Sequence, residues 1–154
     1  MDVSQINCLN EERPHDLKSI FAAKKLNTSP DVYLESGADA QLLLNIHVSP
    51  HADAASKRAH LCTQFNQAVR IRTLVLRSAA APERGPKTLK LLVNKPSISF
   101  GDVEGIDDAV FAQVVTLREE DVRDGRPVAL KFVRFTSVNS LHVRVCLFFF
   151  GLLL

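Results

Sequence analysis

Apolar residues along this chain gather in short runs, and Gly, Pro, Asn and Asp lie between the runs. Alternation of apolar and polar residues is typical of β-strands, and short unbroken apolar runs are typical of strands buried on both faces. The runs that we expect as strands are residues 31–36, 41–47, 68–77, 88–94, 109–117, 128–135 and 141–145. About seven short strands with turn residues between them predict an all-β sandwich or jelly roll.

The run 68–77 has the clearest alternation. Its odd-numbered positions, which share one face, hold Val69, Ile71, Thr73 and Val75. Arg70 and Arg72 lie on the opposite face, which is then interrupted by Leu74 and Leu76. The pattern therefore predicts a strand whose far half is covered on both sides, inside a sandwich.

Helical signals are few. Thr116 and Glu119 have the spacing of a capping box, and Gly125 is suited to end the helix that would follow. We therefore expect one or two helical turns over 119–123. A second short helix is expected over 16–25, where apolar residues recur at helical spacing.

Composition limits the function classes. The chain has 154 residues, 46% of them hydrophobic and 23% charged, which fits one globular domain and excludes wholesale disorder. A net charge of +2 argues against a strongly basic nucleic-acid binder. Three widely spaced cysteines, Cys8, Cys62 and Cys146, do not suit a disulfide framework and favour a reducing compartment.

Two segments do not fit this pattern. Residues 48–64 form a long connection without strand alternation or tight-turn chemistry, whereas most connections in compact domains have about 4–6 residues. Residues 146–154 are apolar, but a membrane-spanning helix needs about 20 such residues, so we expect no membrane span. The polar start of the chain does not resemble a secretory signal peptide.

Candidate chemistry is sparse. His47, His51, His60 and Cys62 form a cluster of metal-ligand types, although Pro50 and the spacing match no standard zinc finger. The alternative interpretation is an exposed loop whose histidines bind nothing. Because no nucleophile elbow or phosphate-binding loop is present, we expect neither catalysis nor a cofactor.

Several short motifs, taken in order, resemble the PITH domain (proteasome-interacting thioredoxin C-terminal domain). They are NCLNE (7–11), LES (34–36), QLL (41–43), FNQAVRI (65–71), GPK (85–87), VNKP (93–96), SFGDVE (99–104), LKFVRF (130–135) and VNSL (138–141). The resemblance covers residues 1–145 except for the 48–64 insert, so 1–145 is the expected domain. It implies a jelly-roll β-sandwich similar to galactose-binding-like domains.

The resemblance also implies a function. Family members with a thioredoxin domain associate through this module with the 26S proteasome regulatory particle, in the cytosol or nucleus. Because no two cysteines have the CxxC spacing of a thioredoxin domain, we expect a member of the single-domain branch, to which redox chemistry does not carry over. We therefore expect a non-catalytic protein-interaction module, with contacts at Arg70, Arg72, Phe100, Asp102 and Glu104. The rival interpretation is a ligand- or metal-binding β-sandwich that uses end loops or the histidine cluster. Metal analysis distinguishes the two interpretations, because stoichiometric zinc in the wild type that is lost in His60→Ala would support the rival.

The departures from the family suggest a hypothesis about the gene. In the family, the strand near 44–46 leads almost directly to the equivalent of 65–67, and a last strand follows 145. Here the chain has the 48–64 insert and the 146–154 tail instead, and we hypothesise that both are translated introns. For the insert, Val48 and Ser49 are compatible with a splice donor and residues 62–64 with an acceptor, while the tail is compatible with read-through to a stop codon. The alternative is a genuine loop and a genuine C-terminus. The hypothesis predicts that the sandwich lacks its last strand. A spliced transcript that still encodes residues 52–61 would exclude it for the insert.

Overall fold

A computed structural model of the chain describes residues 6–22, 29, 31–47, 68–78, 82–96 and 98–147. The strands are β1 (Ile6–Leu9), β2 (Gln41–His47), β3 (Thr73–Leu74), β4 (Pro86–Val93), β5 (Gln113–Thr116), β6 (Val128–Ala129) and β7 (Ser140–Leu147). The helices are α1 (Leu17–Ala22), α2 (Glu119–Asp124) and the 3-10 turns η2 (Pro82–Arg84), η3 (Phe100–Asp102), η4 (Asp108–Val110) and η5 (Phe132–Arg134). No helix among these is long and apolar enough to cross a membrane.

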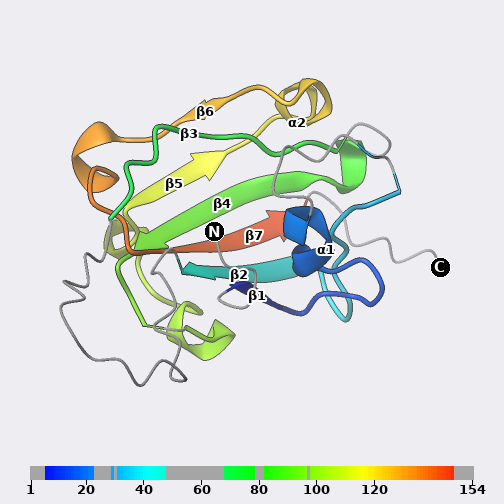
Figure 1. The fold of residues 1–154 in the computed structure, drawn as a ribbon, viewed down its shortest axis with the longest axis horizontal. Coiled ribbons are helices and arrows are strands. Elements are labelled where there is room, and N and C mark those ends of the chain that lie inside the picture. Colours follow the sequence, from blue (N-terminus) through cyan, green and yellow to red (C-terminus); the bar gives the residue numbers. More distant parts are fainter. Residues whose placement is uncertain are drawn as a thin grey trace, which may run out of the picture.

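Five strands form one antiparallel sheet in the order β1-β2-β7-β4-β5, and β3 pairs with β6 in a second, two-stranded sheet (Figure 1). The last described strand, β7, lies in the centre of the larger sheet, where Val143 is paired with Leu44 on one side and Leu91 on the other. The sheet therefore joins the beginning, middle and end of the described chain. This arrangement confirms the all-β class.

The main core lies between the larger sheet and the layer that contains β3 and β6. Alternate residues of β2, β4 and β7 supply one side of this core, including Leu44, Leu91 and Val143. The other side comes from the segments around the small sheet, with Phe135 fully buried, and from the short helices. Burying a large apolar side chain contributes about 1.5–3 kcal/mol, so this shared core holds the two layers together as a sandwich.

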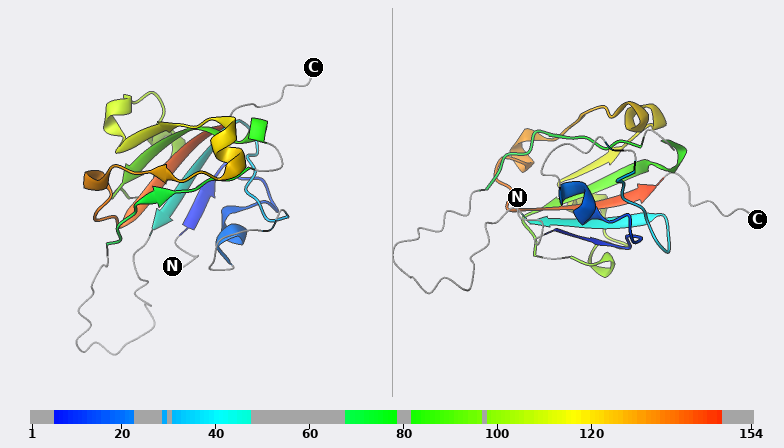
Figure 2. Two further views of the ribbon diagram at one scale, coloured as in Figure 1. Left: turned by 90° about the horizontal axis from the view of Figure 1, so that it is seen from above. Right: turned by 45° about the vertical axis from the view of Figure 1, so that its right-hand side comes forward.

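The opposite face of the larger sheet is also covered. Leu43 and Leu92 point to this outer face and pack with Val103 and Phe111, which belong to the segment 98–112. Figures 1 and 2 show that segment on the side of the sheet opposite β3 and β6. Burial on both faces explains why residues 42–44 of β2 are all apolar instead of alternating.

The predicted strand 68–77 is only partly formed. Its regular pairing is limited to Thr73–Leu74, although Val69 also bridges to Val138. The core-facing positions change phase along the run, from Val69 and Ile71 to Leu74 and Leu76. The predictions that Val75 shares the face of Val69, and that the far half is covered on both sides, are therefore wrong, and Val75 is 47% exposed.

Three other predicted strands differ from the structure. The run 31–36 forms an isolated bridge between Ser36 and Glu11 instead of a strand. Residues 109–117 are divided between η4 and the shorter β5, and residues 128–135 between β6 and η5. In 128–135, the turn at η5 explains why Leu130 and Phe135 both face the core despite their uneven spacing.

Other strand predictions agree closely. The run 41–47 matches β2 at both ends, and 88–94 and 141–145 correspond to the longer β4 and β7. Because β7 continues through Cys146 and Leu147, the first two residues assigned to the apolar tail are part of the sheet. The missing last strand stays a prediction, since residues 148–154 lie outside the described part.

Both predicted helices are present, and α2 begins at Glu119 as predicted, but its capping residue differs from the prediction. Helix α2 begins after Arg118, whose N–H donates to the Asp121 carboxylate at 3.2 Å, so the proposed capping box at Thr116 is wrong. Thr116 is instead the last residue of β5. Gly125 ends α2 with φ of 64°, as predicted. Helix α1 occupies Leu17–Ala22, within the predicted range 16–25.

Candidate interaction surfaces

The five predicted contact residues fall on two separate surfaces. Arg70 and Arg72 lie in the β3 layer, next to Ile71, which packs into the main core. Phe100 packs into the cluster on the other face of the larger sheet, and Asp102 belongs to the same turn, η3. The larger sheet therefore separates the arginine pair from the Phe100 turn.

The first surface forms where the segment before β3 runs beside the segment after β6. Leu130 N–H donates to the Arg72 carbonyl at 3.0 Å, and Ile71 N–H donates to the Phe135 carbonyl at 3.0 Å. This pairing brings Arg70 next to η5, where its guanidinium carbon lies 5.1 Å from the centre of the Phe132 ring. That distance is within the range of a cation–π contact.

The apolar side chains at turn η5 point in different directions, one into the core and two into solvent. Phe135 N–H donates to the Phe132 carbonyl at 3.2 Å and closes the turn. Phe135 is fully buried, whereas Phe132 is 63% exposed and Val133 is 83% exposed. Phe132 and Val133 thus form an exposed apolar projection, and the buried Phe135 ring anchors the turn that carries them.

Cations surround this projection. The projection and these cations together are called the η5 surface. Its exposed residues are Arg70, Arg72, Lys131, Phe132, Val133 and Arg134. Segments 68–78 and 126–147 contain no Asp or Glu. None of the four cations forms an ion pair with a carboxylate of the described residues. By contrast, Arg126 beside α2 is paired with Asp121 and Asp124.

The second surface is the turn around η3. The Asp102 carboxylate accepts hydrogen bonds from the Ser99 backbone N–H at 2.8 Å and from its hydroxyl at 2.7 Å. These two bonds lower the pKa of Asp102. Phe100 is partly covered by the outer-face cluster, and Glu104 is exposed. Asp102 and Phe100 therefore shape the turn, and the contact role of all three residues stays a prediction.

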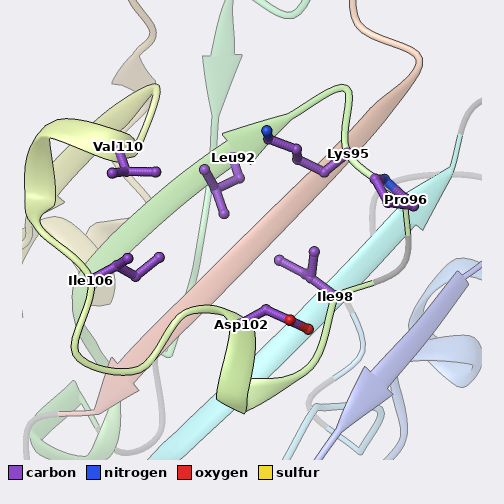
Figure 3. A pocket seen from close by; sticks show the side chains of 7 residues that line it. All are labelled: Leu92, Lys95, Pro96, Ile98, Asp102, Ile106 and Val110. Carbon is purple, nitrogen blue, oxygen red and sulfur yellow. The ribbon is translucent and has the colours of Figure 1, made fainter.

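A groove beside this turn was not predicted from the sequence. It has a volume of about 430 Å³ and is lined by Leu92, Lys95, Pro96, Ile98, Asp102, Ile106 and Val110 (Figure 3). Lys95 lies on one side of the groove and Asp102 on another. The only signal in the sequence was the set of apolar residues in the otherwise polar segment 95–110, which resembles an ordinary loop.

A buried polar cluster lies next to the groove. His142 Nδ1 is 2.6 Å from Asn45 Oδ1, while its Nε2 is 3.0 Å from the Lys95 carbonyl and 3.2 Å from Ser140 Oγ. Asn45 Nδ2 donates to the Ile98 carbonyl at 3.0 Å. Burial lowers the pKa of His142. These bonds attach the loop at Lys95 and Ile98 to the sheet.

The proposed metal cluster lies mostly outside the described residues. Of its four members only His47 is described, and its ring forms a T-shaped contact with the His142 ring at 5.5 Å between centres. Over the described part of the chain, no three His, Cys, Asp or Glu side chains are grouped as metal ligands. The metal hypothesis for His51, His60 and Cys62 therefore stays a prediction.

Comparison with known proteins places these surfaces in a family context. The PITH domain family model matches residues 1–52 and 61–149, and the unmatched residues 53–60 lie inside the segment interpreted as an insert. Thioredoxin-like protein 1 of Schizosaccharomyces pombe is 31% identical over 145 residues, which cover 90% of this chain and 40% of that protein. PITH domain-containing protein 1 is 26% identical in Danio rerio and 24% identical in Homo sapiens, and each match covers 94% of this chain and 58% of the relative.

This chain spans about half the length of the relatives that it matches. The matched residues nevertheless include every described strand and helix, from β1 through β7. The motif resemblance and the family model agree on the same region of the chain. This chain belongs to the PITH domain family.

Proposed function

We propose that this protein is a non-catalytic interaction module of the cytoplasm or nucleus, and that it binds the 26S proteasome regulatory particle through the η5 surface. The observation that carries this proposal is the exposed pair Phe132 and Val133 beside Arg70. The partner class rests on the family, whose name refers to proteasome interaction.

The composition of the η5 surface supports a protein contact. Aromatic residues and arginine are enriched among the residues that dominate protein–protein binding energies. Phe132 and Val133 expose apolar area that gains free energy when a partner removes it from water. The buried Phe135 fixes the turn that presents them, so binding orders few additional groups.

The environments of two reactive residue types support a non-catalytic role. Burial is the main cause that raises the pKa of the Cys8 thiol to about 12, which suppresses the reactive thiolate. His142 is buried, and its ring nitrogens face Asn45 and Lys95 in the loop-anchoring cluster. Each of these groups therefore has a structural role instead of facing a substrate.

The test uses purified regulatory particle and the full chain. We expect wild type to co-elute with the particle in gel filtration, and the double variant Phe132→Ser, Val133→Ser to lose co-elution. Val110→Ser is a matched control, because Val110 is 53% exposed but lies at the groove on the other side of the sheet. Failure of wild type to bind the particle would refute the proposed partner.

A further inference from the structure

We propose that the η5 surface binds an acidic protein segment that carries an apolar anchor side chain. This inference rests on the proposed interaction function and adds the chemistry of the partner. It follows from three properties of the surface: its charge, its apolar projection and its single exposed aromatic ring.

The charge of the surface has one sign. Arg70, Arg72, Lys131 and Arg134 are exposed around the projection, and the two segments that carry them contain no acidic residue. These cations form no ion pair with a carboxylate of the described residues. They therefore create a positive potential that attracts a negative partner and repels a positive one. The missing carboxylates are therefore expected on the partner.

The apolar projection requires that the partner provide an apolar side chain in addition to negative charge. Phe132 already has Arg70 over its ring, and Val133 beside it is the more exposed of the two apolar side chains. Glutamate or aspartate side chains alone would leave this apolar area in water. A partner that places a leucine, isoleucine or similar side chain against Phe132 and Val133 would cover it, while its flanking carboxylates meet the cations.

A protein segment fits better than a nucleic acid. Proteins that bind single strands use several exposed aromatic rings on which successive bases stack. In segments 68–78 and 126–147 the aromatic residues of the Phe, Tyr and Trp type are Phe132 and Phe135, and Phe135 is buried. One ring already in contact with Arg70, together with an aliphatic valine, is suited to an apolar side chain.

The test is fluorescence anisotropy with the full chain and a labelled peptide in which a pair of leucines is flanked on each side by three glutamates. We expect wild type to bind this peptide, and Arg70→Glu or Phe132→Ser to weaken binding by about tenfold, the size of a lost interface contact. Arg118→Glu is the charge control, because Arg118 is exposed immediately before α2, and α2 lies at the other end of the β3 layer from η5 (Figure 1). This control should bind like wild type.

Two altered peptides separate charge from apolar contact. Replacing the glutamates by glutamines should weaken binding about tenfold and remove its dependence on salt, since exposed charge pairs are screened as salt rises. Replacing the leucines by serines should weaken binding to a similar extent. Thermal unfolding confirms that each protein variant is folded.

The outcomes distinguish this inference from the proposed function. Binding of the acidic peptide without binding of the regulatory particle supports the inference and refutes the named partner. Binding of the particle that depends on Phe132 and Val133, yet is unchanged by salt and by Arg70→Glu, overturns the inference and leaves the proposed function in place. Equal binding of the glutamine peptide, or tighter binding of a labelled thymidine octamer, also overturns it.

Discussion

His142 and Asn45 are direct cross-strand neighbours in the centre of the larger sheet, and their side chains are joined at 2.6 Å between Nδ1 and Oδ1. Both residues are buried. Because Asn45 Nδ2 donates to the Ile98 carbonyl, its Oδ1 is the atom that faces His142 Nδ1. One asparagine thus orients the histidine ring and attaches the loop at Ile98.

We expect Asn45→Ala to destabilise the fold by about 1–3 kcal/mol, because it removes the hydrogen-bond partner of His142 Nδ1 and of the Ile98 carbonyl in a buried position. Urea unfolding at pH 7.5 measures the change. Asn7→Ala is the matched control, since Asn7 is exposed on β1 and should change stability by less than about 0.5 kcal/mol. Equal effects of the two substitutions would contradict the role assigned to Asn45.

Burial of His142 also predicts a pH dependence. The pKa of His142 in the folded state is lowered below its ordinary value of 6.5, mainly by burial. As pH falls through 6.5, the unfolded chain therefore takes up a proton that the folded chain resists, and the free energy of unfolding decreases. The contribution is fully present above that pH. Asp16 and Asp102, whose pKa values are lowered from 3.8, titrate at lower pH.

The measurement is urea unfolding at pH 7.5 and 5.5 for wild type and His142→Gln. We expect wild type to lose more stability between these pH values than the variant does, because glutamine does not titrate. An identical pH slope in the two proteins would show that other groups cause it.

Phe132 and Phe135 provide a matched pair within one turn. Phe135→Ala should cost about 3–5 kcal/mol, the range for removing a fully buried aromatic side chain. Phe132→Ala should cost less than about 1 kcal/mol, because the ring is 63% exposed and its contact is with Arg70. Chemical denaturation of the two variants checks this difference. A large loss for Phe132→Ala would mean that the ring supports the fold instead of being available to a partner.

The sequence predicted best where burial is simple. The predicted run 41–47 matches β2 at both ends, and its apolar residues 42–44 lie inside the sheet, where they are covered on both faces. The prediction for the run 68–77 was wrong because it assumed that every second residue faces the core along the whole run. In the structure, the core-facing positions change phase between Ile71 and Leu74. Such an irregularity depends on the pairing of Arg72 with Leu130, far away in the sequence.

The candidate surface shows the same limit. Arg70 and Arg72 were identified from the sequence because they alternate with core positions. Phe132 and Val133 were missed, since a strand over 128–135 would have buried one of two neighbouring residues. Only the turn at η5 directs both to solvent and brings Phe132 under Arg70.

Gly125 supplies the last prediction, because its φ of 64° lies in the left-handed region that residues with a Cβ atom rarely adopt. Gly125→Ala should destabilise the fold by about 1–2 kcal/mol through backbone strain at the end of α2. Gly101→Ala is the control, since Gly101 has no such φ and its added Cβ would lie 3.8 Å from Ser99 Oγ, an ordinary contact. Thermal or urea unfolding of both variants measures the difference. If Gly101→Ala were as harmful as Gly125→Ala, loss of space and not backbone conformation would be the cause.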